Sequence, residues 1–253
     1  MSDGSPHDFY SRLYASELEQ EAAWLDLTAP VKVRSVRNLL TRHHLRPATV
    51  LELGCGVGAV IRECRRSGIG TSHTAIDYSP DAILFLQARA PEIRSIIADI
   101  TSPEFSINGA TFDLVLIPHV LEHLDDPAGF LSLTIEHIPF RNLIVEVPLE
   151  DLSAARIKNR FRDRRKNTAG HVQFFTGATF LNLLSSSGLE IIDTMTYAPV
   201  LSPAAMDLAR KRNGWRRPAW ILRSITQRYA PMLTAAIFKR LYHAHCAALC
   251  RKP

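Results

Sequence analysis

The residues best placed to do chemistry begin with a glycine-rich turn, Gly54-Cys55-Gly56-Val57-Gly58. This turn follows the apolar run Val50–Leu53, in which Glu52 is the one acidic residue, and a helix-forming run comes next. Glycines let the backbone turn tightly and let a ligand approach the main chain. A helix that begins there also points unpaired N–H groups at the turn. This arrangement predicts a nucleotide-binding site, although it does not choose the nucleotide.

Acidic residues follow the next two apolar runs as well. Asp77 comes directly after His73–Ile76, and Asp99 comes directly after Arg94–Ala98. An acid about 20 residues beyond a G-x-G-x-x-A turn, which Ala59 completes here, is also the pattern of dinucleotide-binding enzymes, where it contacts a ribose hydroxyl. The turn and its first acid are therefore compatible with NAD and with other adenosine ligands.

A second set of candidates consists of histidines that could accept a proton. His119 and His123 lie in Pro118–Pro127, directly after the fourth apolar run, and His171 lies in Gly170–Thr176. His119 stands where ligands bind in open α/β sheets. A positioned histidine can take the proton of a hydroxyl acceptor. The alternative is that these histidines only fix the loops that carry them, which we favour for His123.

We expect no metal site here. Glu122, next to the second histidine, is expected to face elsewhere as a polar anchor. Asp125 and Asp126 precede Pro127, a pattern typical of a helix N-cap rather than of metal ligands.

These residues are far apart in the sequence, so strands and helices must bring them together. Helix-forming segments separate apolar runs at 50–53, 73–76, 94–98, 112–117 and 142–147, and further runs follow at 189–197 and 242–251. Strands and helices that alternate at short spacing predict an α/β fold with a parallel sheet and helices on both faces. Before the first strand, helical periodicity predicts two helical pieces over residues 8–45, separated at Pro30.

The fourth run continues as Phe112-Asp113-Leu114-Val115-Leu116-Ile117-Pro118-His119-Val120-Leu121-Glu122-His123-Leu124-Asp125-Asp126-Pro127. Together with Glu52, Asp77 and Asp99, this block resembles class I S-adenosylmethionine-dependent methyltransferases, most closely the small-molecule branch that includes the ubiquinone-pathway O-methyltransferases. The resemblance covers about residues 33–197 and the last strand. It implies a Rossmann-like, seven-stranded, mostly parallel sheet with an N-terminal helical lid and a helical insertion between the last two strands.

The resemblance implies S-adenosylmethionine as the cofactor, S-adenosylhomocysteine as its product, and no metal. The glycines would pass under the methionine part, where Glu52 would hold the turn. Asp77 would accept hydrogen bonds from both ribose hydroxyls, since a carboxylate offers two acceptor oxygens. Tyr78 would flank the adenine, whose amino group Asp99 would bind. The implied cofactor contacts are Glu52, Gly54, Cys55, Gly56, Gly58, Asp77, Tyr78, Asp99, Ile100, Pro118 and His119.

The acceptor side of the predicted site rests on weaker signals. The catalytic candidates are His119, His171 and His123, and the substrate or lid candidates are Tyr10, Tyr14, Glu150, Arg160 and His171. The basic loop 150–170 would border the acceptor, which suggests an anionic acceptor; the alternative is a solvated basic surface.

The resemblance divides the chain into an N-terminal helical lid (1–32), a cofactor-binding core (33–197), a helical cap (198–240) and a final strand (241–253). Residues 205–240 mix basic and aromatic side chains. This mixture predicts contact with a membrane surface or, as the commoner explanation, a cap that packs on the sheet or forms a homodimer.

The composition agrees with a cytoplasmic enzyme. The chain has 253 residues, a net charge of +5 and four cysteines. It shows no C-x-x-C pair, no apolar signal core, and no apolar run near the roughly 20 residues that span a bilayer. We therefore expect methyl transfer to a small-molecule acceptor, at a hydroxyl, with sugars and phosphorylated or lipid-linked metabolites as the candidate acceptors. The alternatives are a tRNA or nucleic-acid methyltransferase, which lacks support because no [DN]-P-P-[YF] run is present, and a non-catalytic S-adenosylmethionine-binding protein.

Overall fold

The computed structural model describes residues 6–107, 109, 111–149, 170–197, 199, 201–213, 221 and 244–252. The predictions for Glu150, Arg160 and the side chains of Tyr10 and Tyr14 lie outside the described residues. The same holds for the basic loop and for most of the predicted helical cap, of which α7 (Pro203–Asn213) is described.

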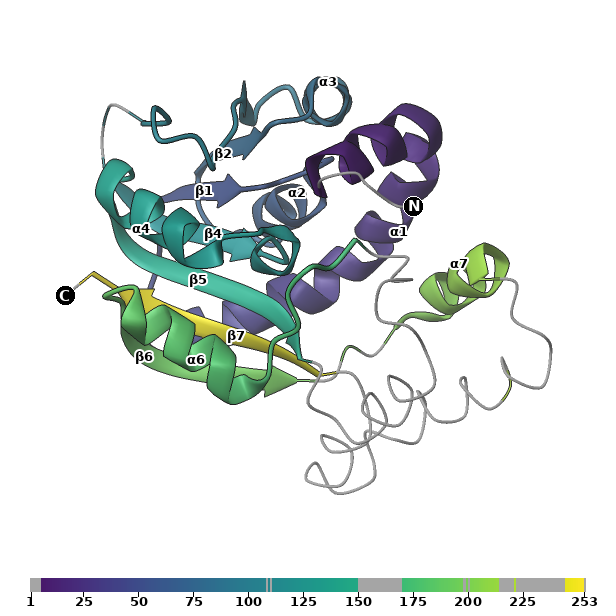
Figure 1. Ribbon diagram of the computed structural model, residues 1–253. Helices are drawn as coiled ribbons and strands as arrows, with labels where there is room; N and C mark the ends of the chain where they lie inside the picture. The colour runs from purple at the N-terminus through teal and green to yellow at the C-terminus, as the bar shows by residue number, and fades with distance from the viewer. Residues whose placement is uncertain are drawn as a thin grey trace.

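One seven-stranded sheet forms the centre of the molecule, with the strand order β3-β2-β1-β4-β5-β7-β6 (Figure 1). The first five strands run parallel, and β7 is antiparallel to both of its neighbours, β5 and β6. The prediction of a seven-stranded, mostly parallel sheet is thus confirmed. The strands are β1 (Thr49–Leu53), β2 (Ser72–Asp77), β3 (Arg94–Ile97), β4 (Phe112–Pro118), β5 (Phe140–Leu149), β6 (Glu190–Tyr197) and β7 (Ala244–Arg251).

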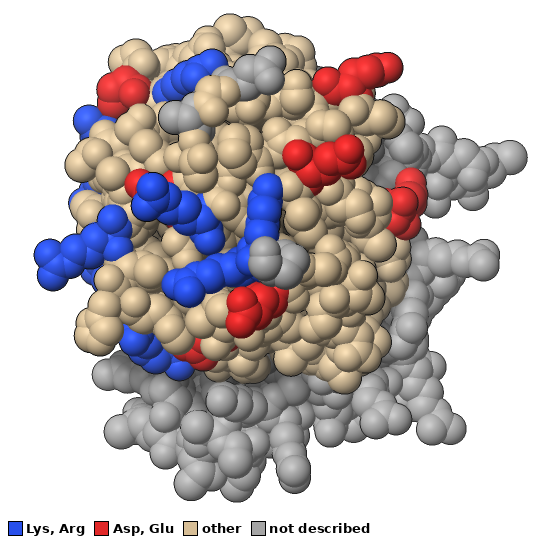
Figure 2. Space-filling model, turned by 90° about the vertical axis from the view of Figure 1, so that its left-hand side faces the viewer, with Lys and Arg blue, Asp and Glu red and all other residues tan. Residues whose placement is uncertain are grey.

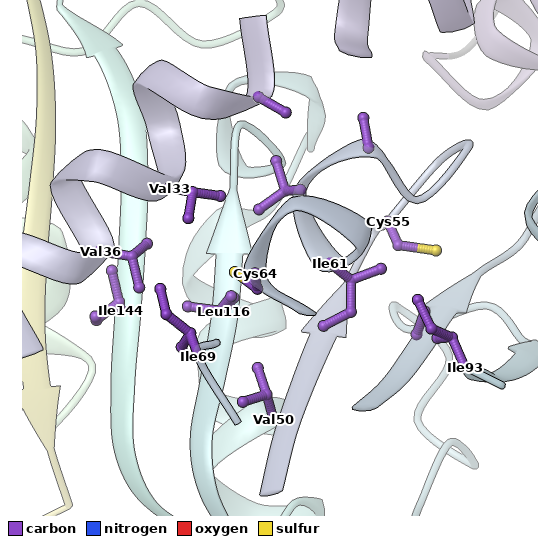
Figure 3. Close-up of a cluster of buried hydrophobic side chains, with 14 of the residues drawn as sticks. Val33, Val36, Val50, Cys55, Ile61, Cys64, Ile69, Ile93, Leu116 and Ile144 are labelled. Atoms are coloured by element: carbon purple, nitrogen blue, oxygen red, sulfur yellow. The ribbon is translucent and has the colours of Figure 1, made fainter. Parts of the chain in front are cut away.

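Helices cover both faces of this sheet. The core on one face contains residues of α1 (Pro6–Arg42), α2 (Ala59–Arg66) and α3 (Pro80–Arg89). The core on the other face contains residues of α4 (Pro127–His137) and α6 (Gly177–Ser186). Successive side chains of a strand point to opposite faces. Leu116 accordingly belongs to the first core, shown in Figure 3, and Ile117 to the second.

The predicted helix N-cap before Pro127 is confirmed, and two other helices also begin with a side-chain cap. The Ser79 side chain accepts a hydrogen bond from the Ala82 N–H at the start of α3, and Asp126 accepts one from the Gly129 N–H at the start of α4. Thr176 caps α6. Each cap satisfies an N–H that the first helical turn leaves unpaired.

The predicted break at Pro30 is wrong. Pro30 lies inside α1, whereas the backbone leaves helical geometry at Glu17, with φ −133° and ψ 23°. Beyond the proline, Val33 and Val36 are buried against the sheet (Figure 3), and Leu39 belongs to the same core. Packing of this apolar stripe supplies most of a helix's stability in a protein, and it carries the helix past one missing N–H.

The two ends of the sheet differ in what they present. The chain's C-terminal end lies at the amino ends of the parallel strands, because β7 runs against them (Figure 1). Figure 2 shows this side, where Lys and Arg side chains lie near Asp and Glu side chains. The glycine turn, Asp77, His119 and His123 lie at the opposite, carboxyl end. Among the described residues, no helix has both the length and the apolar character needed to cross a membrane. All four cysteines are buried and unbridged.

Candidate functional site

The glycine turn joins β1 to α2 at the carboxyl end of the sheet. Gly54, Gly56 and Gly58 have φ values of 67°, 52° and 73°, a region that side chains disfavour. A Cβ atom on Gly54 would lie 2.6 Å from the Cγ2 atom of Val120, and one on Gly58 would collide with Leu86. Backbone conformation and packing both require glycine at these two positions.

Two buried acids support this turn. Asp77, at the end of β2, accepts a hydrogen bond from the Gly56 N–H through Oδ2 (2.7 Å) and one from the Ser79 N–H through Oδ1 (3.0 Å). Glu52 is only 2% exposed, and its Oε2 atom has no hydrogen-bond partner among the described residues. Burial raises the pKa of Glu52 to about 8, although a backbone hydrogen bond from Ile61 and the charge of Lys32 oppose the shift.

The third predicted acid lies next to the second. The Ala98 N–H donates to the Asp77 carbonyl oxygen (3.0 Å), so Asp99 follows β3 beside the end of β2. Asp99 is exposed, and its Oδ1 atom accepts hydrogen bonds from the N–H (2.9 Å) and the hydroxyl (2.6 Å) of Thr101. Tyr78 is half-buried, while Cys55 and Ile100 are buried.

His119 links two acids at the end of β4. Its Nδ1 atom lies 3.0 Å from Oε1 of Glu122, and its Nε2 atom lies 3.1 Å from Oε1 of Glu146. Burial and the charge of Lys32 lower the pKa of His119, but the two carboxylates outweigh them and raise it above its ordinary value. The expectation that Glu122 faces elsewhere is wrong. The segment Leu121–His123 forms a 3₁₀ turn, which brings residues three apart to the same side.

Glu146, His245, Tyr197 and Ser35 were not singled out from the sequence. Glu146 is 2% exposed and accepts hydrogen bonds from the hydroxyls of Tyr197 (2.6 Å) and Ser35 (2.8 Å). His245 Nδ1 lies 3.4 Å from the same carboxylate and 3.1 Å from Nε2 of His119. The sequence carried one signal for this group, namely Glu146 itself. An acid within an apolar strand is expected to be buried, and a buried carboxylate needs hydrogen-bond or charged partners.

Burial and neighbouring charges set the protonation of this group. Burial opposes ionisation of Glu146, but hydrogen bonds from His119 and His245 outweigh it and hold the pKa of the carboxyl well below its ordinary value. Burial, followed by the charge of His119, lowers the pKa of His245 to about 4. At neutral pH the His245 imidazole is therefore neutral and the Glu146 carboxylate is ionised, while the raised pKa of His119 favours its charged form.

His123 and His171 meet on the other side of Glu122. Their rings are 5.0 Å apart in an edge-to-face arrangement, and Nδ1 of His123 lies 3.1 Å from the Gly170 carbonyl oxygen. The backbone of Glu122 holds this segment, because its carbonyl oxygen accepts from the N–H groups of Val172 (2.8 Å) and Gln173 (3.0 Å). Burial lowers the pKa of His123 despite the charge of Glu122. Burial also opposes ionisation of Glu122, but His119, ahead of His123 and His171, lowers its pKa to about 2.

The structure thus brings together all three predicted histidines, around Glu122, close to the glycine turn. Val120, which lies between two of them, is the side chain that packs on Gly54. Two sets of donor atoms converge closely enough to hold a metal ion: His119, Glu146 and His245, and separately Glu122, His123 and His171. The expectation of no metal assumed that the sequence has no H-x-x-x-H pair, but His119 and His123 form one, and this spacing is a signal for such sites.

Comparison with known proteins shows what this chain is similar to. A family model described as a methyltransferase domain matches residues 16–194. The ubiquinone biosynthesis O-methyltransferase of Azorhizobium caulinodans is 33% identical over 113 residues, which are 40% of this chain and 44% of that protein. The chain thus spans less than half the length of this curated relative, and the same holds for that of Methylocella silvestris.

Solved structures share the fold at low sequence identity. The magnesium protoporphyrin IX methyltransferase of Synechocystis, solved with bound S-adenosylhomocysteine, has a TM-score of 0.57 at 15% identity, covering 90% of this chain and 86% of that one. The N-methyltransferase NodS of Bradyrhizobium japonicum, also solved with S-adenosylhomocysteine, has a TM-score of 0.52 at 18% identity, covering 88% and 87%.

Proposed function

Because this chain belongs to the class I S-adenosylmethionine-dependent methyltransferases, we propose that it moves the methyl group of S-adenosylmethionine to a hydroxyl of a small-molecule acceptor. The observation that carries the proposal is the buried, unpartnered Oε2 atom of Glu52 beside a turn that requires glycine. A buried carboxylate oxygen without a donor is costly, and a cationic ligand group would relieve that cost.

The residues around the turn fit the cofactor. The ammonium group of the methionine part would pair with Glu52, and the backbone of the three glycines would lie beneath that part. Asp77 already accepts one hydrogen bond on each oxygen, but an ionised carboxylate has about four acceptor sites, so both ribose hydroxyls can still bind it. Tyr78, Asp99 and Ile100 would border the adenine at the ends of the next strands.

The cofactor supplies an activated methyl group on a sulfonium. The chain's own residues then have to align the acceptor, exclude water and remove a proton from the hydroxyl. His119 and Pro118 lie at the end of β4, beside the turn, and would border the methyl group. Since both ring nitrogens of His119 face carboxylates, its proton is held rather than exchanged, and its role is to position Glu122 and Glu146.

His123 fits the role of the base better. Its lowered pKa keeps the ring neutral near pH 7. The Gly170 carbonyl holds the proton on Nδ1, so Nε2 is the atom that accepts. His171, whose ring packs on that of His123, would contact the acceptor.

A hydroxyl acceptor is supported by the relatives, whose names describe O-methyltransferases of ubiquinone biosynthesis. Acceptors that carry neighbouring hydroxyls on a ring are accordingly the first class to test. The anionic character of the acceptor, membrane contact and dimer formation stay predictions, since the segments that motivate them lie outside the described residues.

The cofactor test is calorimetric titration with S-adenosylhomocysteine. Asp77→Ala removes one hydrogen bond to the turn, one to Ser79 and the acceptors for the ribose, so we expect binding at least 10-fold weaker than in the wild type. Asp81→Ala, which changes an exposed acid of α3, should bind normally. Wild-type protein that binds no S-adenosylhomocysteine would rule out the proposal.

The acceptor test uses methyl-labelled S-adenosylmethionine with a panel of catechols, phenols and sugars. On a hydroxyl acceptor, His123→Ala should lower kcat by 10²-fold or more, the usual contribution of a general base. His137→Ala, on the partly exposed surface of α4, should leave kcat unchanged. Cofactor binding without transfer to any acceptor would favour a non-catalytic protein, and transfer to RNA alone would favour a nucleic-acid enzyme.

A further inference from the structure

Three donor atoms from three adjacent strands converge at the carboxyl end of the sheet. They are Nε2 of His119 after β4, Oε1 of Glu146 on β5 and Nδ1 of His245 on β7. Nε2 of His119 lies 3.1 Å from each of the other two atoms, which are 3.4 Å from each other. Backbone pairing fixes the triangle, because the His119 N–H donates to the Glu146 carbonyl oxygen (2.8 Å) and Pro148 pairs with His245.

The size of this triangle suits a metal ion. A point about 2 Å from all three atoms exists near its centre, and this is the length of zinc bonds to imidazole nitrogen and carboxylate oxygen. Hydrogen bonds explain the same triangle less well. His119 and His245 can each donate an N–H to Glu146, but the two ring nitrogens, 3.1 Å apart, would then face each other with a hydrogen on both sides.

Neighbouring side chains contact His119 and Glu146 in the way that second-shell residues commonly contact metal ligands. The second ring nitrogen of His119 faces the carboxylate of Glu122 at 3.0 Å. Glu146 accepts from the hydroxyls of Ser35 and Tyr197. Such second-shell partners fix the tautomer and the orientation of first-shell ligands.

Two further observations point the same way. His119 has a φ of 59°, a conformation that costs a non-glycine residue energy and that clusters at functional sites. In addition, Glu122 and Glu146 are both buried, and in the described part of the chain the basic side chains beside their carboxylates are all histidines. A divalent cation would balance these two carboxylates.

We propose that His119, Glu146 and His245 bind a divalent transition-metal ion, with Glu122, Ser35 and Tyr197 as its outer shell. Two imidazoles and one carboxylate suit Zn²⁺, Co²⁺ or Fe²⁺ better than Mg²⁺ or Ca²⁺, which prefer oxygen ligands. The site stands on its donor atoms and does not depend on the proposed methyl transfer. If that transfer occurs, a metal at this place could hold an acceptor hydroxyl and ease the loss of its proton.

The test is titration of chelator-treated, desalted protein with Zn²⁺ by calorimetry and with Co²⁺ by visible absorption. We expect one ion per wild-type chain and ligand-field bands for bound Co²⁺. His245→Ala and Glu146→Gln should each weaken Zn²⁺ binding at least 100-fold, and Tyr197→Phe about 10-fold, within the range for second-shell changes. His137→Ala and His171→Ala should bind as the wild type does.

Three results would overturn the proposal: no saturable Zn²⁺ binding by the wild type, binding that survives His245→Ala in a folded variant, or binding that His171→Ala abolishes. The last would place the ion at Glu122, His123 and His171 instead. Circular dichroism checks each variant, and the nearly isosteric Glu146→Gln decides if His245→Ala does not fold. Calorimetry with S-adenosylhomocysteine on the same samples shows separately whether the cofactor site has failed.

Discussion

Glu52 should make the stability of the ligand-free protein depend on pH. Burial raises the pKa of this carboxyl from 4.5 to about 8, so the folded protein holds a proton that the unfolded chain releases. Its contribution to the free energy of unfolding is fully present below about pH 4.5. That contribution is lost as the pH rises toward 8, because only the unfolded state then gains by ionising.

The size of the effect follows from the number of protons involved. One proton held only by the folded state changes the free energy of unfolding by about 1.4 kcal/mol per pH unit. Between pH 5 and pH 7, both inside the window, the wild type should lose about 3 kcal/mol relative to a variant that cannot ionise at this position. Glu52→Gln is that variant, since the amide is neutral at every pH and nearly the same shape.

Urea unfolding at pH 5, 6 and 7 measures the difference. The stability of Glu52→Gln minus that of the wild type should rise steadily across this range, while all other titrating groups cancel in the subtraction. Glu190→Gln, which changes an exposed glutamate on β6, should show no such trend. If the difference for Glu52→Gln stays flat from pH 5 to 7, Glu52 is ionised in the fold and the reasoning from burial fails.

Two further predictions concern the same turn. Gly58→Ala should cost about 2–4 kcal/mol of stability in urea unfolding, since it adds left-handed strain to overpacking against Leu86; Gly68→Ala, with φ 71° and open space around its Cβ, should cost only about 1–2 kcal/mol from the strain. Equal costs would show that the contact is absent. S-adenosylmethionine binding should release up to about one proton near pH 7, because its ammonium group favours ionised Glu52. Calorimetry in buffers of different ionisation enthalpy measures this release, and release that persists in Glu52→Gln would assign it elsewhere.

Local signals explain why the cofactor half of the site was predictable. The parallel strands β1, β2, β4 and β5 are largely buried, so each is a short apolar run in the sequence, and an acid at or after the end of such a run can mark the strand's carboxyl end. Asp77 and Asp99 could therefore be placed beside the glycine turn before any contact was known. The caps of α3 and α4 were equally local, since each lies within three residues of the N–H that it binds.

The histidine–glutamate half of the site depends on contacts between residues that are far apart in the sequence, and no local pattern predicts such contacts. Glu146 and His245 are 99 residues apart in the sequence, and they meet only because β7 pairs with β5 in one particular register. The sequence around His245, at the start of β7, does not indicate which strand β7 pairs with or in which register. The predicted helix break at Pro30 was wrong for a related reason. Burial of α1 on the sheet stabilises the helix by more than proline destabilises it locally.

The two halves are also mechanically connected. Gly54 belongs to the cofactor turn, and the side chain that fills the space beside it is Val120, which lies between His119 and His123. Protein interiors are closely packed, so Gly54 and Val120 leave no free space between them. A movement of the turn would therefore displace the segment that carries both histidines. The positive φ of His119, directly before Val120, shows that this segment is already held away from relaxed geometry. If the cofactor's methionine part binds at this turn as proposed, its binding is expected to influence the histidine–glutamate group through the contact of Val120 with Gly54.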